Sequence, residues 1–454
     1  MRKLLLAFAV SVAAQDGVPG LAIDQAVARA IDRYAAVRVS AEQVAAAAHG
    51  IQMARTAYLP QADYIVQLNR ATRNNVFGML MPQSVIAPIS GPPLAENSMT
   101  NVWGSATGLL VSWEPFDFGL RQARLDSATA GQRRAEAALL RTKFEIASAT
   151  ADTFLTVLAA QQTVRTAQAT IARSKALVEV IAAQVKAELR PGADLSRIQA
   201  ETAMAEGQLI QAEQAVAMAK ANLSQFVAEA PAGLQPSAGR LLDPPPAPVL
   251  AQADLALHPA SREQAAAIHE TKARAKILDK SYYPRFNVQG TTYARGTGAN
   301  ANFSTGGAFS GFGPNIVNWG AGLSMTFPIG SLPGLRVQKQ MEATLTRMET
   351  QRQEQLRQDL MAQLARAQAQ FEGARRMVDK IPAQVEAASQ TELQATARYR
   401  AGLGTIAEVA EAQRLVAQSE IDLSLSHLAV WRAMLAISAA QGDLEPFLRA
   451  ASGK

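Results

Sequence analysis

Hydrophobic and polar positions alternate without interruption from Val317 to Phe327. The odd positions carry Val, Trp, Ala, Leu, Met and Phe, and the even positions carry only Asn, Gly, Ser and Thr. A period of two predicts a β-strand whose two faces meet different surroundings. The segment covers roughly 34 Å, which projects to roughly 24 Å at a tilt of about 45°, close to the apolar band of an outer-membrane barrel. It fits a strand with lipid on one face, and equally a half-buried strand of a soluble sheet.

Extended alternation recurs, so four strands are expected, near 61–70, 102–113, 286–294 and 315–327. In the second strand, Trp103 and Trp113 share a face at the spacing of the aromatic girdles that mark the two interfaces of a membrane. Trp319 and Phe327 are assigned to the same girdles in the last strand. These aromatic residues favour the membrane interpretation.

The stretch that follows the second strand predicts a long helix of roughly 105 Å, because it has helical periodicity and lacks proline. Its apolar residues recur at spacings of four and three, as in the heptad seam of a coiled coil: Leu140, Phe144, Ala147, Ala151, Phe154 and Leu158. Pro191 is expected to end this helix, and Asp194 or Ser196 to cap the next one. Residues 120–228 therefore predict a helical hairpin with its tip near 190–196.

The same order of elements recurs after a proline-rich linker at 229–250. Pro284 corresponds to Pro60, and Gly334-Leu335-Arg336 corresponds to Gly119-Leu120-Arg121. The second half is expected to contain a helix, two strands and a helical hairpin at 335–441 with its tip near 400–405. These correspondences predict an internal duplication, with a first repeat at 15–228, a second at 251–448 and a tail at 449–454.

The amino terminus predicts a secretory signal peptide at 1–14. Arg2 and Lys3 precede about nine apolar residues, fewer than the roughly 20 that a spanning helix needs. No later run is long and apolar enough to predict a membrane-spanning helix. The chain has no cysteine, and so no disulfide, thiolate metal site or cysteine-linked lipid anchor. The protein is expected to be exported.

Composition argues against several classes of function. The net charge is +6, without a dense basic block that would bind nucleic acid. The four histidines are scattered without ligand spacing, and no nucleophile or phosphate-binding motif is present. We therefore expect no enzyme activity, no metal site and no cofactor.

Four strands cannot close a barrel in lipid, because unpaired edge groups each cost several kcal/mol there. The chain is therefore expected to oligomerise. Three copies would supply twelve strands and a lumen wide enough for a solute.

Several motifs occur in a characteristic order: the strand entries Leu59-Pro60 and Tyr283-Pro284, the strand exit from Trp113 to Gly119, and the segment Tyr399-Arg400-Ala401-Gly402-Leu403-Gly404-Thr405-Ile406-Ala407-Glu408-Val409. With them the chain resembles the TolC-like outer-membrane efflux and export channels, the outer membrane factors. The resemblance implies a mixed fold, in which a transmembrane antiparallel β-barrel with four strands per chain continues as a periplasmic α-helical coiled-coil barrel. It also implies a homotrimer in the outer membrane of a Gram-negative bacterium, in contact with lipid.

The same resemblance implies function and partners. The trimer would be the exit duct of a tripartite efflux pump or type I secretion system. It would dock to a periplasmic adaptor, or membrane fusion protein, that works with an inner-membrane transporter.

The resemblance also implies docking residues at the two hairpin tips. Gly402, Leu403 and Thr405 match the docking pattern of the family, and Gly192, Ala193 and Ser196 match it loosely. The alternative is turn chemistry alone, in which Gly192 and Gly402 are needed for positive φ at a helix end.

A pore gate is implied just beyond the second tip, where Glu408 and Glu411 would form rings of carboxylates that attract cations. The alternative is a local role, because Glu408 has the capping-box spacing to Thr405 and can cap its own helix. Tyr399 matches the tyrosine with which the family ties the closed entrance. Gly404 and Ile198 stand where the arginine and the aspartate of that tie are expected.

Two other interpretations remain at this point. A soluble periplasmic coiled-coil adaptor or scaffold would explain the signal peptide and the heptads, but not the four alternating segments. A barrel adhesin with a helical stalk fits the duplicated hairpins poorly.

Overall fold

The computed structural model describes residues 20–72, 96, 99–244, 254–300, 302 and 304–453. The expected signal peptide lies outside these residues. The chain divides into two compact units. The first unit comprises Met1–Gln43, Ala135–Ala265 and Gln351–Lys454, and the second comprises Val44–Arg134 and Ala266–Thr350. Each of the two expected repeats thus contributes to both units.

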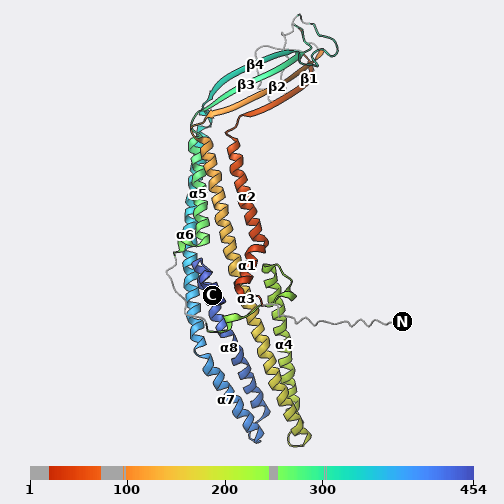
Figure 1. Ribbon diagram of the computed structural model, residues 1–454, viewed down its shortest axis with the longest axis vertical. Coiled ribbons are helices and arrows are strands. Elements are labelled where there is room, and N and C mark those ends of the chain that lie inside the picture. Colours follow the sequence, from red (N-terminus) through yellow and green to blue (C-terminus); the bar gives the residue numbers. More distant parts are fainter. Residues whose placement is uncertain are drawn as a thin grey trace, which may run out of the picture. The chain divides into compact units, whose positions relative to one another are not determined.

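The second unit contains an antiparallel sheet in the order β1-β2-β3-β4 (Figure 1). The strands are β1 (Gln61–Thr72), β2 (Asn101–Phe116), β3 (Arg285–Thr297) and β4 (Ile316–Thr326). This confirms the four strands per chain. The strands β2 and β3 extend a few residues beyond the expected ends, and Phe327 lies just past the end of β4.

The register collects apolar side chains on one side of this sheet. Tyr64 pairs with Leu109, Leu109 with Thr292, and Thr292 with Trp319. Residues paired across antiparallel strands share a face. That face, here called the apolar face, holds eleven exposed large residues: Tyr64, Val66, Leu68, Leu109, Trp113, Phe116, Val288, Val317, Trp319, Leu323 and Met325. The opposite face carries most of the polar strand residues, including Asp63, Gln67, Asn69, Asn287, Gln289, Asn318 and Ser324. Apolar residues outside and polar residues inside are typical of a membrane barrel.

A buried ion pair holds the turn between β2 and helix α3 (Leu120–Lys186). The Asp117 carboxylate accepts hydrogen bonds from the backbone N–H of Gly119 at 3.1 Å and of Arg121 at 2.7 Å, and from Arg121 Nε at 2.9 Å. The Arg121 guanidinium lies 4.7 Å from the centre of the Tyr58 ring. Phe118 and Gly119 both have positive φ, 52° and 87°, which turns the chain sharply from strand to helix.

Helices complete the second unit. They are the carboxyl-terminal part of α2 (Ala35–Thr56), the start of α3, most of α5 (Pro259–Lys280), the short turn η4 (Ile329–Ser331) and the start of α6 (Leu332–Val378). Ion pairs connect α3 and α5, namely Arg134 with Glu270 at 2.9 Å and Lys276 with Asp126 at 3.0 Å.

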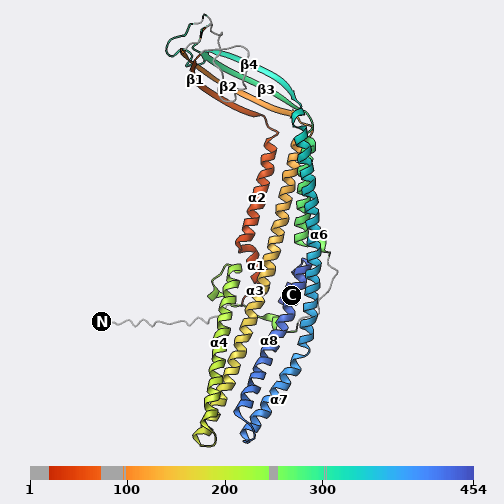
Figure 2. The same cartoon turned by 180° about the vertical axis from the view of Figure 1, so that it is seen from behind.

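The first unit is built around two helical hairpins. One is formed by α3 and α4 (Gly192–Val227), and the other by α7 (Ile381–Arg400) and α8 (Ile406–Gln441). Figures 1 and 2 show both hairpin tips at the same end of this unit. The remaining helices are α1 (Ile23–Arg33) and α9 (Glu445–Ser452), together with the end of α6.

The core of the first unit lies where α3, α8 and α9 meet. Phe154, Trp431 and Phe447 are fully buried there, and the rings of Trp431 and Phe447 meet edge to face at 6.1 Å. The predicted heptad seam on α3 is buried at Ala147, Ala151, Phe154 and Leu158, whereas Leu140 remains half exposed. By length and composition α8 is apolar enough to cross a membrane, contrary to our expectation, but more than half of its most apolar window is buried in this core.

The second long helix is broken, which corrects the continuous helix expected from residue 335 to the tip. Helix α6 ends at Val378 and α7 begins at Ile381. Pro382 is the physical reason, because it has no N–H to donate to the carbonyl of Val378. α3, the corresponding helix of the first half, is continuous.

Much of the expected linker is packed against the core. It contains the short turns η1 (Pro231–Gly233) and η2 (Gly239–Leu242), and Leu234 and Leu241 are buried. A third turn, η3 (Leu255–Leu257), precedes α5.

Candidate functional site

The first hairpin tip exposes the three residues matched loosely to the docking pattern. Gly192, Ala193 and Ser196 are all exposed. Gly192 is the first residue of α4 and has ordinary negative φ, so the expectation of a glycine needed for positive φ is wrong here; Glu188 takes the left-handed conformation instead, with φ of 59°. The expected capping is also wrong, because Pro191 is the residue before the helix and Ser196 donates to the Gly192 carbonyl.

The second tip is a Schellman turn. The N–H of Leu403 donates to the carbonyl of Arg398 at 2.9 Å, and the N–H of Gly402 donates to Tyr399 at 3.0 Å. Gly402 has φ of 76°, which a residue with a side chain adopts only with strain. Leu403 stands at the turn with 73% of its surface exposed. An exposed leucine on a rigid turn is suited to contact with another protein.

Three side chains connect the two tips. The Tyr399 hydroxyl on α7 donates to Asp194 Oδ2 on α4 at 2.9 Å. The Arg190 guanidinium lies 4.3 Å from the centre of the Tyr399 ring and donates to the Tyr399 carbonyl. Burial, followed by the hydrogen bond to Asp194, raises the pKa of Tyr399 to about 12, so the hydroxyl keeps its proton at neutral pH.

Sequence reasoning missed Arg190 and Asp194 as partners of Tyr399. It looked for an arginine at Gly404 and an aspartate at Ile198, but Ile198 is fully buried. With Ile181, Ile406 and Val409 it forms the apolar cluster on which the Tyr399 ring packs. The signal in the sequence was Asp194 itself, a polar residue at the first tip that was interpreted only as a helix cap.

The two glutamates assigned to the gate are exposed on the first turns of α8. The Thr405 hydroxyl accepts a hydrogen bond from the Glu408 backbone N–H at 3.4 Å, as in a helix cap. Glu411 forms an ion pair with Arg414 on the next turn. Each carboxylate therefore has a local role in its own helix, and neither is buried.

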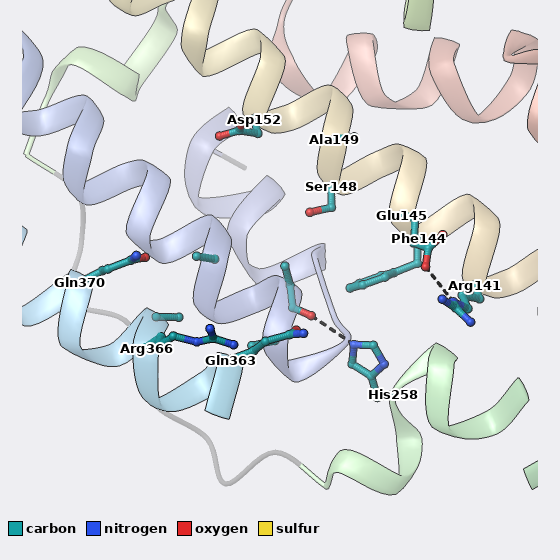
Figure 3. Close-up of a pocket in the computed structure, with 14 residues that line it drawn as sticks. Arg141, Phe144, Glu145, Ser148, Ala149, Asp152, His258, Gln363, Arg366 and Gln370 are labelled. Atoms are coloured by element: carbon teal, nitrogen blue, oxygen red, sulfur yellow. Dashed lines mark hydrogen bonds and ion pairs between the residues drawn. The ribbon is translucent and has the colours of Figure 1, made fainter. Parts of the chain in front are cut away.

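A cavity of about 660 Å³ lies between α3, α6 and the end of α8 in the first unit (Figure 3). Arg141 lines this cavity, and its guanidinium forms ion pairs with Glu145 at 2.7 Å and Glu263 at 3.0 Å. Both ring nitrogens of His258 also make hydrogen bonds. Nδ1 accepts from the Ala260 N–H at 3.1 Å, which leaves Nε2–H to donate to the Ala439 carbonyl at 3.3 Å. Burial lowers the pKa of His258, so the ring is neutral. This lining presents no nucleophile with an adjacent base.

Within the described ranges, no three side chains of His, Asp or Glu are grouped as possible metal ligands.

The four girdle residues lie on the apolar face or directly beyond it. Trp103 and Trp319 are near the beginnings of β2 and β4, and Trp113 and Phe327 are near their ends. The Trp113 indole donates to the Tyr58 carbonyl at 3.1 Å, while Trp319 is 82% exposed.

Comparison with known structures shows the same fold in outer-membrane channels. The outer-membrane channel OprN has 17% identity and a TM-score of 0.72, over 92% of this chain and 89% of its own. CusC, solved in a study of folding and transmembrane channel formation, has 14% identity and a TM-score of 0.75, over 95% and 96%. The Campylobacter jejuni CmeC outer membrane channel has 13% identity and a TM-score of 0.73, over 92% and 85%. No curated protein sequence matches significantly.

A four-stranded sheet with an apolar face, in a chain with long helical hairpins, defines the class of outer-membrane channels with periplasmic helices. The chain belongs to the family described as outer membrane efflux protein, which matches residues 26–229 and 250–443. The two matched ranges also fit the internal duplication. Its family and the similar structures are channels, so the protein is an efflux channel of the outer membrane. This result excludes the interpretation as a soluble scaffold.

Proposed function

We propose that three copies of the chain close one barrel and that the trimer is the exit duct of a tripartite efflux pump or type I secretion system. The observation that carries this proposal is the sheet itself, in which β1 and β4 are hydrogen-bonded on one side only among the described residues. In lipid each open edge needs a partner strand, and a neighbouring copy can supply it. Twelve strands would surround a lumen with the polar face inside.

The assembly is tested on detergent-extracted protein by analytical ultracentrifugation with correction for bound detergent. We expect the mass of three chains, and a monomer or dimer would contradict the proposal.

Docking to a periplasmic adaptor is assigned to the exposed tips, through Gly402, Leu403 and Thr405 and through Gly192, Ala193 and Ser196. Leu403 is the apolar contact in this proposal. A photo-crosslinking amino acid at position 403 should capture an adaptor in living cells. The same amino acid at Leu415, which is exposed on α8 but away from the tip, should not. Equal capture at both positions would contradict docking at the tip. The inner-membrane transporter would act through the adaptor.

We assign a gating role to the contact of Tyr399 with Asp194 and Arg190. The contact joins the two tips within one chain, so its loss should allow them to separate and the entrance to widen. Glu408 and Glu411 would then line the entrance and favour cations.

Single-channel conductance in planar bilayers tests the gate. Tyr399→Phe and Asp194→Asn should each raise the conductance. The control is Tyr34→Phe, since the Tyr34 hydroxyl makes no hydrogen bond within the described chain and its ring only stacks on Phe226. If Tyr399→Phe conducts like the control, the contact is not a gate. Replacing both Glu408 and Glu411 with glutamine should reduce cation preference, and unchanged selectivity would leave them as helix-capping and ion-pairing residues only.

A further inference from the structure

The loop between β3 and β4 folds back onto the apolar face of the sheet. Its segment 304–313, here called the aromatic loop, brings the Phe312 ring against Trp103, edge to face at 5.4 Å, and Phe309 against Phe312 at 6.2 Å. Phe309 is 75% exposed and Phe312 50%. Two exposed phenyl rings beside a tryptophan make an apolar patch that water solvates poorly.

Glycine allows this loop to approach the strands closely. A Cβ at Gly311 would overlap backbone atoms of Gly298 and Trp103, and a Cβ at Gly296 would overlap the Gly313 carbonyl. Backbone hydrogen bonds hold the loop and the strand ends together, from Gly298 N–H to the Trp103 carbonyl at 2.8 Å and from Gly306 N–H to Gly298 at 2.9 Å. The backbone therefore fixes the loop on the sheet while its aromatic side chains remain uncovered.

A cationic side chain stands beside the same cluster. Arg70 pairs with Trp103 across β1 and β2, and its guanidinium lies 5.2 Å from the Trp103 ring. Arg70 Nε donates to Asn101 Oδ1 at 2.6 Å, which orients the planar group. The side chain is exposed, and no carboxylate in the described part of the chain forms an ion pair with it. A positive charge is thus presented next to the aromatic patch.

The position of the cluster indicates what covers it. Trp103 lies on the apolar face, and the exposed Leu68 lies on that face close by, paired with Ser105. In an outer-membrane protein this face meets acyl chains, and Trp103 is at the end of the strands opposite to Trp113. The patch therefore continues a lipid-contacting surface to the level where acyl chains end and headgroups begin.

We propose that this cluster is a lipid-binding site, in which Trp103, Phe309 and Phe312 insert at the boundary of acyl chains and headgroups and Arg70 binds the phosphate of an anionic lipid. Indole and phenyl rings suit that boundary, being apolar with a weakly polar edge. A guanidinium donates two parallel hydrogen bonds to a phosphate. The site would fix the depth of the barrel in the membrane.

The absence of cysteine permits a clean measurement of depth. Single cysteines replace Phe309, Val317 as a reference on the apolar face, and Ser324 as a reference on the polar face. Each carries a nitroxide label in vesicles of phosphatidylcholine and phosphatidylglycerol, and its collision rates with oxygen and with a water-soluble nickel chelate are compared. The label at position 309 should collide more often with oxygen than with the nickel chelate, as the label at 317 should. The label at 324 should not show this preference.

The labelling experiment can overturn the proposal in two ways. A label at 309 that collides freely with the nickel chelate would place the loop in water. A label that neither reagent reaches would show that protein covers it, from another loop or another copy. Position 317 reports separately whether the strands contact lipid, so failure of the loop site is distinguishable from failure of the barrel.

Quenching of tryptophan fluorescence by brominated lipids tests whether the positive charge of Arg70 binds the lipid phosphate. In a variant with Trp113→Phe and Trp319→Phe, Trp103 is the remaining tryptophan on the apolar face. There brominated phosphatidylglycerol should bind next to Trp103 more tightly than brominated phosphatidylcholine, by about fivefold, the factor that one arginine provides at an anionic surface. Arg70→Gln should abolish this preference. The matched control is Arg285→Gln, because Arg285 is exposed on the opposite face, and it should keep the preference. Retention of the preference in Arg70→Gln would overturn the assignment of the phosphate to Arg70.

Discussion

Arg173 on α3 and Glu420 on α8 form a two-pronged ion pair, with Nη1 3.0 Å from Oε1 and Nη2 2.7 Å from Oε2. The pair connects the two hairpins between the Tyr399 contact at the tips and the core around Trp431. About one third of each side chain is exposed. Because the guanidinium plane matches the carboxylate, the pair sets the direction in which one hairpin lies along the other.

Removal of this pair should loosen the hairpins without unfolding the protein. We expect Arg173→Gln and Glu420→Gln to show a coupling of about 1 kcal/mol in a double-mutant cycle, as for partly exposed ion pairs. The free energy of unfolding is measured by urea denaturation and circular dichroism. Additive effects of the two substitutions would mean that the pair contributes nothing beyond its separate side chains.

The contact of Tyr399 with Asp194 should withstand alkaline pH. The protonated hydroxyl is the donor, so the contribution of the contact to stability is complete below pH 10.0, the ordinary pKa of tyrosine, and is lost as pH rises to about 12. Titration of the ultraviolet absorbance of tyrosinate should show one late component that Tyr399→Phe removes. The same component in the variant would assign the late titration to another tyrosine.

His258 should make the first unit sensitive to acid. Burial, and to a lesser extent the charge of Arg141, lowers its pKa and outweighs the hydrogen bond to the Ala439 carbonyl and the charge of Glu145, which both raise it. A base with a lowered pKa stabilises the fold fully above pH 6.5 and loses that contribution as pH falls through the lowered value. His258→Gln should cost roughly 1–2 kcal/mol at neutral pH, through lost hydrogen bonds, but should reduce the fall of Tm on acidification.

The control for this prediction is His269→Gln, since His269 is exposed and should leave acid sensitivity unchanged. If acidification lowers the Tm of His258→Gln and of the wild type by the same amount, another group is responsible for the acid sensitivity.

Gly108 should be required for the pairing of β2 with β3. A Cβ there would overlap the Tyr293 side chain and crowd the Thr292 carbonyl. Gly108→Ala should destabilise the sheet by roughly 1–3 kcal/mol, seen as loss of heat-modifiable migration of the folded barrel in gels. Gly290→Ala is the matched control, because a Cβ at Gly290 meets nothing within 4 Å. Equal migration of the two variants would contradict the steric argument.

The four-stranded sheet was predictable because its physical cause acts on every residue of a strand. Lipid on one face requires an apolar side chain at each second position, and the segment from Val317 to Phe327 obeys this rule throughout. The break before Pro382 was missed because the surrounding residues keep a helical period, and one proline is a weak signal within it.

The candidate site was harder to predict, because its residues come from hairpins far apart in sequence. Tyr399 was recognised from its own motif, but Arg190 and Asp194 reach it only when α4 and α7 lie together. No local spacing encodes such a contact. The docking, gating and girdle roles of individual residues remain predictions for the experiments above.

The interruption between α6 and α7 gives the duplicated halves different mechanical properties. α3 is one continuous helix, whereas its counterpart has a joint at Asp379 and Lys380, where the Lys380 N–H donates to the Met377 carbonyl at 2.9 Å and Pro382 has no N–H to donate. Under an equal lateral force, bending in the second hairpin concentrates at that joint, and the first deflects evenly along its length. The two halves of the internal repeat thus differ, with an uninterrupted arm in the first and a jointed arm in the second.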